Sequence, residues 1–158
     1  MDYVSIFSCC GNDSGNAEGE YLLLPGWSRQ DWQKLFAVTT SRPFKASEFV
    51  IQRGVSDRAL YLVGSGTLEV GVTYVDGVSI SPLAKIGAGS VIGEQSFFDG
   101  QPRSANVFAV TDGELLCLMP EKFREFSEAD PALARDLVFA LARILSLRLR
   151  HTTFRVRH

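Results

Sequence analysis

The residues best placed to do chemistry lie in the segment VIGEQSFFDGQPRSANV, which holds a glycine, a glutamate and an arginine close together. Gly93 lets the backbone approach a ligand closely, and residues 94–98 are long enough for about one helical turn with free amides, which favour phosphate. Arg103 carries a permanent positive fork that matches two phosphate oxygens. Phosphate would repel Glu94, so if both side chains serve one ligand, Glu94 must meet a donor such as a sugar hydroxyl. The pattern predicts a ligand with one phosphate and a ribose.

The run IGEQSFFDGQPRSA resembles the phosphate-binding cassette of cyclic nucleotide-binding domains, in which Gly-Glu is followed by a loop and then Pro-Arg-Ser/Ala/Thr-Ala. The resemblance extends upstream through EFVIQRG, ALYLVGSGTLEV and IGAGSVIGE, and downstream through PEKFREF. It covers about residues 28–150 and is strongest toward sensor domains of the catabolite activator type. The resemblance implies a receptor for cyclic AMP or cyclic GMP that is not an enzyme and needs no cofactor.

The resemblance also implies roles for single residues. Arg103 would bind the cyclic phosphate and Glu94 the ribose 2'-hydroxyl, while Gly93, Ser104 and Ala105 would complete the phosphate cradle with backbone amides and one hydroxyl. The remaining ligand residues that it implies are Leu68 and Leu83, which would line the base, and Arg148, whose guanidinium would lie over the purine.

Three positions bear on the choice of nucleotide. Gln95 stands where the family usually has an aliphatic residue, although this change removes no ligand contact. Arg148 and Leu149 replace the two hydroxyl residues that read the purine in the activator, so the base must be read differently here. Ser104 stands where a threonine tends to accompany a preference for cyclic GMP, and it therefore favours cyclic AMP.

The hydrophobic pattern predicts a mainly β fold with flanking helices, namely a jelly-roll β-barrel (a double-stranded β-helix) with an N-terminal helix and a long C-terminal helix. From about residue 44 to 119, apolar and polar residues alternate in short runs separated by glycines, and Asp76-Gly77 is typical of a tight hairpin. Ser28 is expected to cap the first helix, and Asp130-Pro131 to start the last. The expected organisation is a flexible arm at 1–25, a cyclic nucleotide-binding domain at 26–150 and a basic tail at 151–158.

Length and charge restrict the function classes. A chain of 158 residues with 46% hydrophobic content can bury one good core, with no room for a second full domain such as a helix-turn-helix. Together with the net charge of −2, this argues against specific DNA binding. The N-terminus lacks a basic n-region, and no segment approaches the ~20 apolar residues of a membrane helix, so we expect a cytoplasmic protein without membrane association.

The last helix and the cysteines leave several readings open. The apolar face of the helix is wide enough to pair with a second copy of the chain, or it covers only its own barrel. A partner effector protein is expected, of unknown identity. Cys9 and Cys10 fall in a leader rich in Gly, Ser and Asn, and Cys117 is expected to be a buried thiol in an apolar strand.

The sequence leaves two alternatives to a nucleotide receptor. A metal-dependent enzyme of the cupin type needs histidines inside the barrel, but His151 and His158 both lie beyond it in the sequence. A ligand-free interaction or dimerisation module that keeps the fold is the other alternative. Gln95 and the altered helix face favour such a module, whereas the intact Glu94 and Arg103 argue against it.

Overall fold

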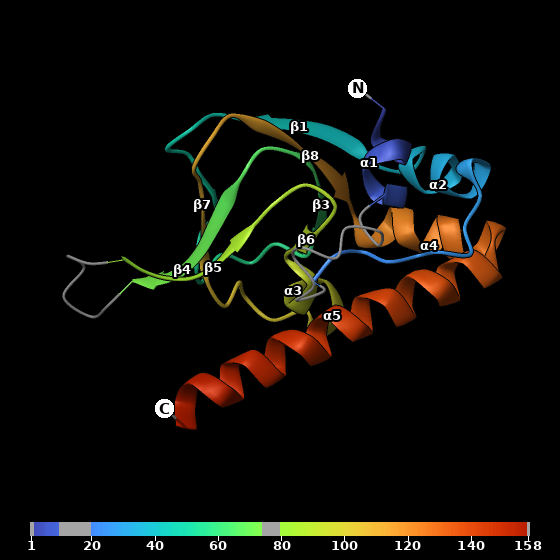
Figure 1. Ribbon diagram of the computed structural model, residues 1–158. Helices are drawn as coiled ribbons and strands as arrows, with labels where there is room; N and C mark the ends of the chain where they lie inside the picture. The colour runs from blue at the N-terminus through green and yellow to red at the C-terminus, as the bar shows by residue number, and fades with distance from the viewer. Residues whose placement is uncertain (1, 10–19, 74–79, 158) are drawn as a thin grey trace.

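The computed structural model describes residues 2–9, 20–73 and 80–157, and within these it describes residues 72–73, 80–83 and 152–157 by their backbone alone (Figure 1). The helices are α1 Tyr3–Cys9, α2 Arg29–Phe36, α3 Glu94–Asp99, α4 Pro120–Ala129 and α5 Pro131–Arg157. The strands are β1 Thr40–Phe44, β2 Phe49–Ile51, β3 Leu60–Ser65, β4 Leu68–Thr73, β5 Ile80–Ile86, β6 Val91–Ile92, β7 Asn106–Ala109 and β8 Gly113–Leu118.

The strands form two antiparallel sheets, with strand orders β1-β8-β3-β6 and β2-β7-β4-β5. The sheets face each other across one buried cluster, to which every strand contributes an apolar side chain: Phe44, Ile51, Val63, Leu68, Ile86, Ile92, Val107 and Leu115. Figure 1 shows the strands curving around this interior with the helices gathered to one side and α5 running beneath. The expected fold class, a jelly roll with flanking helices, is confirmed.

Strand β3 is buried on both faces, and its sequence reflects this position. Tyr61 and Val63 point into the barrel cluster, whereas Leu60 and Leu62 join a second cluster on the helical side. A strand covered on both sides can be apolar at every position. The run LYLV is therefore the central layer between the barrel interior and the helices.

The helical side of the molecule is built from α1, α2, α4 and α5. Ser28 caps α2 as expected: its hydroxyl accepts from the backbone N–H of Asp31 at 3.2 Å, and the Asp31 carboxylate accepts from the Ser28 N–H at 2.9 Å. Trp32 and Leu35 then face inward from α2, and Leu137 and Leu141 face them from α5 in the same cluster. This packing sets the position of α5 against the barrel.

Two boundaries differ from those expected. Within the flexible arm expected at 1–25, residues 3–9 form α1, where Phe7 is buried with its ring centroid 5.6 Å from that of Trp32, and Leu22 is buried too. A seven-residue helix is too short to show a clear hydrophobic period, so only its tertiary contacts define it. The basic tail expected from residue 151 continues α5, which ends at Arg157.

Three further expectations concern single features. The Asp76-Gly77 hairpin lies outside the described residues, although β4 and β5 on either side of it pair antiparallel. Cys10 also lies outside them, Cys9 is exposed, and Cys117 is only partly buried rather than enclosed in the core. None of the helices in the described part of the chain is long and apolar enough to span a bilayer.

Candidate functional site

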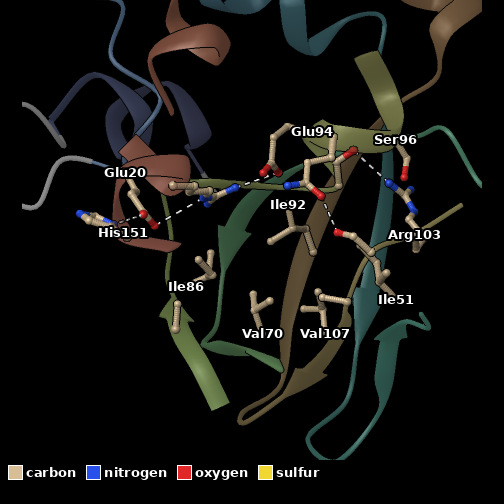
Figure 2. Close-up of a pocket in the computed structure, with 16 residues that line it drawn as sticks. Glu20, Ile51, Val70, Ile86, Ile92, Glu94, Ser96, Arg103, Val107 and His151 are labelled. Atoms are coloured by element: carbon tan, nitrogen blue, oxygen red, sulfur yellow. Dashed lines mark hydrogen bonds and ion pairs between the residues drawn. The ribbon is translucent and has the colours of Figure 1, made fainter. Parts of the chain in front are cut away.

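A cavity of about 180 Å³ lies between the barrel strands, α3 and α5 (Figure 2). Its apolar wall consists of Ile51, Val70, Ala84, Ile86, Ile92 and Val107. Its polar side consists of Glu20, Glu94, Gln95, Ser96, Arg103, Ser104, Arg148 and His151, with Gly93 and Ala105 completing the lining. An apolar wall facing a few convergent polar groups is the usual form of a small-molecule site.

Arg103 is the fixed cation of the cavity. Only 3% of its side chain is exposed, and its guanidinium donates to two carbonyl oxygens, from Nη1 to Gly93 at 2.9 Å and from Nη2 to Ala59 at 2.7 Å. Its Nε is buried and has no hydrogen-bond partner among the described residues. Buried donors in proteins are nearly always paired, so a ligand or a water molecule can supply the acceptor that the described residues do not.

Three polar side chains that do not line the cavity orient Arg103. Asp57 Oδ2 lies 3.1 Å from Arg103 Nη2 and accepts from the Tyr61 hydroxyl at 3.2 Å, while Arg42 Nη1 donates to the Tyr61 oxygen at 3.2 Å. Burial opposes ionisation of Asp57, but the hydrogen bond from the Ala59 N–H and the contact with Arg103 outweigh it and lower the pKa of Asp57. Asp57 therefore stays anionic at neutral pH and fixes the orientation of the guanidinium.

Gly93 is the residue that lets Arg103 approach the backbone. It precedes α3 with a left-handed φ of 80°, which favours glycine. A Cβ atom at this position would lie 2.6 Å from Arg103 Nη1 and 2.9 Å from the carbonyl oxygen of Ala59. Any side chain here would displace the guanidinium, so glycine at position 93 is a requirement of packing as well as of backbone conformation.

Glu94, the first residue of α3, is buried and bonded to α5. Its Oε2 lies 2.8 Å from Arg148 Nη1. The same arginine donates from Nη2 to the carbonyl oxygen of Val91 at 2.8 Å and to the Ser90 hydroxyl at 3.3 Å, and its Nε lies 3.4 Å from Glu20 Oε2. Arg148 thus ties α5 to the segment that carries the cassette. A carboxylate has about four lone-pair sites, so Glu94 can accept a further hydrogen bond.

Two residues of the cavity were not expected from the sequence. Glu20 lies next to Arg148, and its Oε1 lies 3.0 Å from Nδ1 of His151 (Figure 2). Glu20 belongs to a segment without periodicity and gives no sequence signal. His151 stands three residues after Arg148, a spacing that places both on one face of a helix, and this could have identified it.

The structure brings together six of the eight residues expected to bind ligand: Gly93, Glu94, Arg103, Ser104, Ala105 and Arg148 all line the cavity. Leu68 does not line it, because this side chain is fully buried in the barrel core. Val70, which shares the inward face of β4, reaches the cavity instead. The side chain of Leu83 lies outside the described part of the structure. The Ser104 hydroxyl donates to the Gln95 side-chain oxygen.

The geometry defines a jelly-roll domain with a cavity of convergent polar groups between the barrel, α3 and α5, and comparison with known proteins identifies the family. Residues 41–130, more than half of the chain, match the model of the cyclic nucleotide-binding domain. The chain belongs to this family, as the resemblance of its cassette implied, and it is a nucleotide-binding regulatory domain. The family segment contains the buried Arg103 and Glu94, whereas Glu20, Arg148 and His151 lie outside it.

Individual relatives show how this domain is used elsewhere. The cyclic AMP receptor protein of Thermus thermophilus is 38% identical over 61% of this chain and 44% of its own length. Glutaminase 1 of Bradyrhizobium diazoefficiens is 32% identical over 82% of this chain but only 20% of its own length. A solved cyclic nucleotide-binding domain from Methylobacillus flagellatus shares the fold with a TM-score of 0.79, at 22% identity over 98% of this chain and 82% of its own. The chain thus spans less than half the length of these two sequence relatives.

Proposed function

We propose that this chain is a non-catalytic receptor for a cyclic nucleotide, cyclic AMP in preference to cyclic GMP, and that it acts in the cytoplasm. The observation that carries the proposal is the buried guanidinium of Arg103, which is held rigidly at the cavity and has a buried Nε without a partner among the described residues. A cyclic phosphate supplies both the negative charge and the acceptor that this group requires.

The rest of the cavity accommodates the remaining parts of such a ligand. With the phosphate on Arg103 and the adjoining Ser104 and Ala105, the ribose 2'-hydroxyl reaches Glu94, which lies on the same side of the cavity. The base then packs on the apolar wall. Arg148, which is bonded to Glu94, would stack on the base, and a guanidinium on an aromatic plane contributes roughly 0.5–2 kcal/mol.

The output of the receptor is proposed to be the position of α5. Glu94 would bind the ligand directly, and it also bonds Arg148 of α5 at 2.8 Å. In the closed form, the contact between Glu94 and Arg148 keeps α5 against the cavity. A ligand that contacts both residues binds this form better than any form in which α5 has moved away from the cavity. It therefore shifts the population of α5 toward the closed form, and a partner protein reads the difference.

Calorimetric titration with cyclic AMP and with cyclic GMP tests the binding itself. Wild-type protein is expected to bind at micromolar concentration or tighter. Arg103→Ala should lose about tenfold to several hundredfold in affinity, because charge-assisted hydrogen bonds contribute roughly 1.5–3 kcal/mol each. Arg103→Lys keeps the charge next to Asp57 but should also bind weakly, because it lacks the planar fork. If both variants bind the nucleotide as tightly as wild type, the phosphate is bound elsewhere in the protein.

A ligand-free interaction module is the second candidate. It is favoured by the pairing of polar groups within the cavity, since Arg148 is bonded to Glu94 and Gln95 accepts from Ser104. In such a module these contacts would be the permanent structure rather than contacts that a ligand shares. Absence of binding to either nucleotide by a folded wild-type protein would favour this candidate.

A second copy of the chain is the proposed partner of the exposed face of α5. The side chains of Phe139 and Leu149 on this helix are 72% and 68% exposed, the highest values among the large apolar residues that the structure describes as exposed. A second copy that covers this face would remove both apolar side chains from water. Whether an effector protein also uses this face depends on the oligomeric state.

A further inference from the structure

The segment before α2 contributes a carboxylate to the nucleotide cavity from outside the family segment. Glu20 uses both of its oxygens on α5: Oε2 lies 3.4 Å from Arg148 Nε, and Oε1 lies 3.0 Å from His151 Nδ1. The two α5 residues stand about one turn apart and present their side chains on the same face. One carboxylate therefore contacts two successive positions of the helix that covers the cavity.

Glu20 is itself fixed to the barrel. Its backbone carbonyl accepts from the Ser90 hydroxyl, the next residue, Tyr21, forms a β-bridge with Ser90, and the Leu22 N–H donates to Gly89 at 2.9 Å. Leu22 is fully buried, which anchors the segment further. The carboxylate thus belongs to the rigid barrel, and its contacts with α5 join two parts of the molecule that are proposed to move relative to each other.

We propose that Glu20 is a positioning residue of the nucleotide site, which holds Arg148 and α5 over the cavity through a contact with His151 that strengthens as the imidazole becomes protonated. The inference rests on the proposed function for its effect on nucleotide affinity. It goes further in naming a residue before the family segment and in making the affinity depend on pH.

The sign of the pH dependence follows from the groups around His151. The charged side chains of this part of the cavity are Glu20 from the N-terminal segment, Glu94 from α3 and Arg148 from α5. Histidine is the side chain whose charge ordinarily changes between about pH 5 and pH 8. Protonation converts the contact with Glu20 into an ion pair and adds a positive charge beside the site of an anionic ligand. Both effects favour binding, so affinity should rise as the pH falls.

The test is calorimetric titration of cyclic AMP at about pH 5.5 and about pH 8, which lie on either side of the ordinary pKa of histidine. Because exposed ion pairs contribute ~0.2–1 kcal/mol, wild-type affinity should be about 1.4- to fivefold higher at the lower pH. His151→Gln should show no such rise. Glu20→Gln should show less than half of this rise in affinity, since the His151 imidazole still gains its charge but has no carboxylate at position 20 to pair with. Glu128→Gln, which removes an exposed carboxylate on α4, is the matched control and should behave as wild type.

A measurement without ligand tests the hold on α5 separately. Hydrogen exchange of the amides at 144–151, compared at one acidic pH, should be about 1.4- to fivefold faster in Glu20→Gln than in wild type. Equal exchange, or a pH rise in affinity that Glu20→Gln fully retains, would overturn the inference while leaving a nucleotide receptor intact. If wild type binds no cyclic nucleotide at either pH, the proposed function fails, and the exchange rates alone then decide the role of Glu20.

Discussion

Arg148 Nη1 lies 2.8 Å from Glu94 Oε2, so the first residue of α3 is bonded to α5. The two residues are 54 positions apart in the sequence (148 minus 94). Each group has its own place in the proposed ligand contacts, Glu94 at the ribose and Arg148 at the base. A nucleotide bound in the proposed way would therefore bridge the barrel and α5, which is the physical basis of the proposed response.

Removal of the Arg148 guanidinium should uncouple α5 from the ligand. In wild type, saturating cyclic AMP is expected to slow hydrogen exchange along residues 131–150, because the ligand favours the closed helix. In Arg148→Ala that slowing should be largely lost, even at a concentration that fills the site. Protection of α5 that is the same in both proteins would show that the helix is held by its apolar face and not by the ligand.

Substitution of Gly93 should damage both stability and binding. Gly93→Ala places a Cβ 2.6 Å from Arg103 Nη1 at a φ of 80°, and such backbone strain costs about 1–3 kcal/mol of unfolding free energy. Nucleotide affinity should fall at least about tenfold, since the displaced guanidinium loses charge-assisted hydrogen bonds. Gly87→Ala is the matched control, because a Cβ there meets nothing within 4 Å. Denaturant unfolding and calorimetry measure the two effects, and equal behaviour of the variants would refute this account.

Asp57 should contribute stability that disappears in acid. Its folded pKa is lowered, so the carboxylate stabilises the fold above its unfolded pKa, and this contribution is lost as the pH falls through the folded value. Because the Asp57 side chain is 37% exposed, solvent screening limits the loss in Asp57→Asn to about 1 kcal/mol at neutral pH. The difference in unfolding free energy between the two proteins should shrink as the pH falls below about 3.9, the ordinary pKa of aspartate. If the difference in unfolding free energy stays constant with pH, it comes from packing and not from the charge of Asp57.

The exposed face of α5 should set the oligomeric state. Phe139→Ser is expected to shift the protein from dimer to monomer in sedimentation at micromolar concentration, because it removes a large apolar contact from the proposed interface. Val110→Ser, which changes an exposed apolar residue outside the helices, should leave the mass unchanged. A wild-type protein that sediments as a monomer with and without cyclic AMP would remove the second copy as the partner of this face.

The sequence by itself determined the local features of the fold. The alternating runs indicated the barrel, Ser28 indicated the start of α2, and the motif IGEQSFFDGQPRSA indicated Gly93, Glu94 and Arg103. Each of these signals depends on neighbours within a few positions, where side-chain period, caps and glycine conformations are encoded directly. For the same reason the short helix α1 was missed, since only its packing against α2 distinguishes it from a loop.

Only the tertiary structure decided which distant side chains meet. It showed that Val70 rather than Leu68 lines the cavity, because the cavity occupies only part of the inward face of β4. It also brought Glu20 to Arg148 across 128 positions of the chain. Such a contact depends on where α5 packs against the barrel, and that placement is the sum of many apolar contacts with no single local signature. The sequence therefore indicated the phosphate end of the site, and the packing of α5 determined the rest.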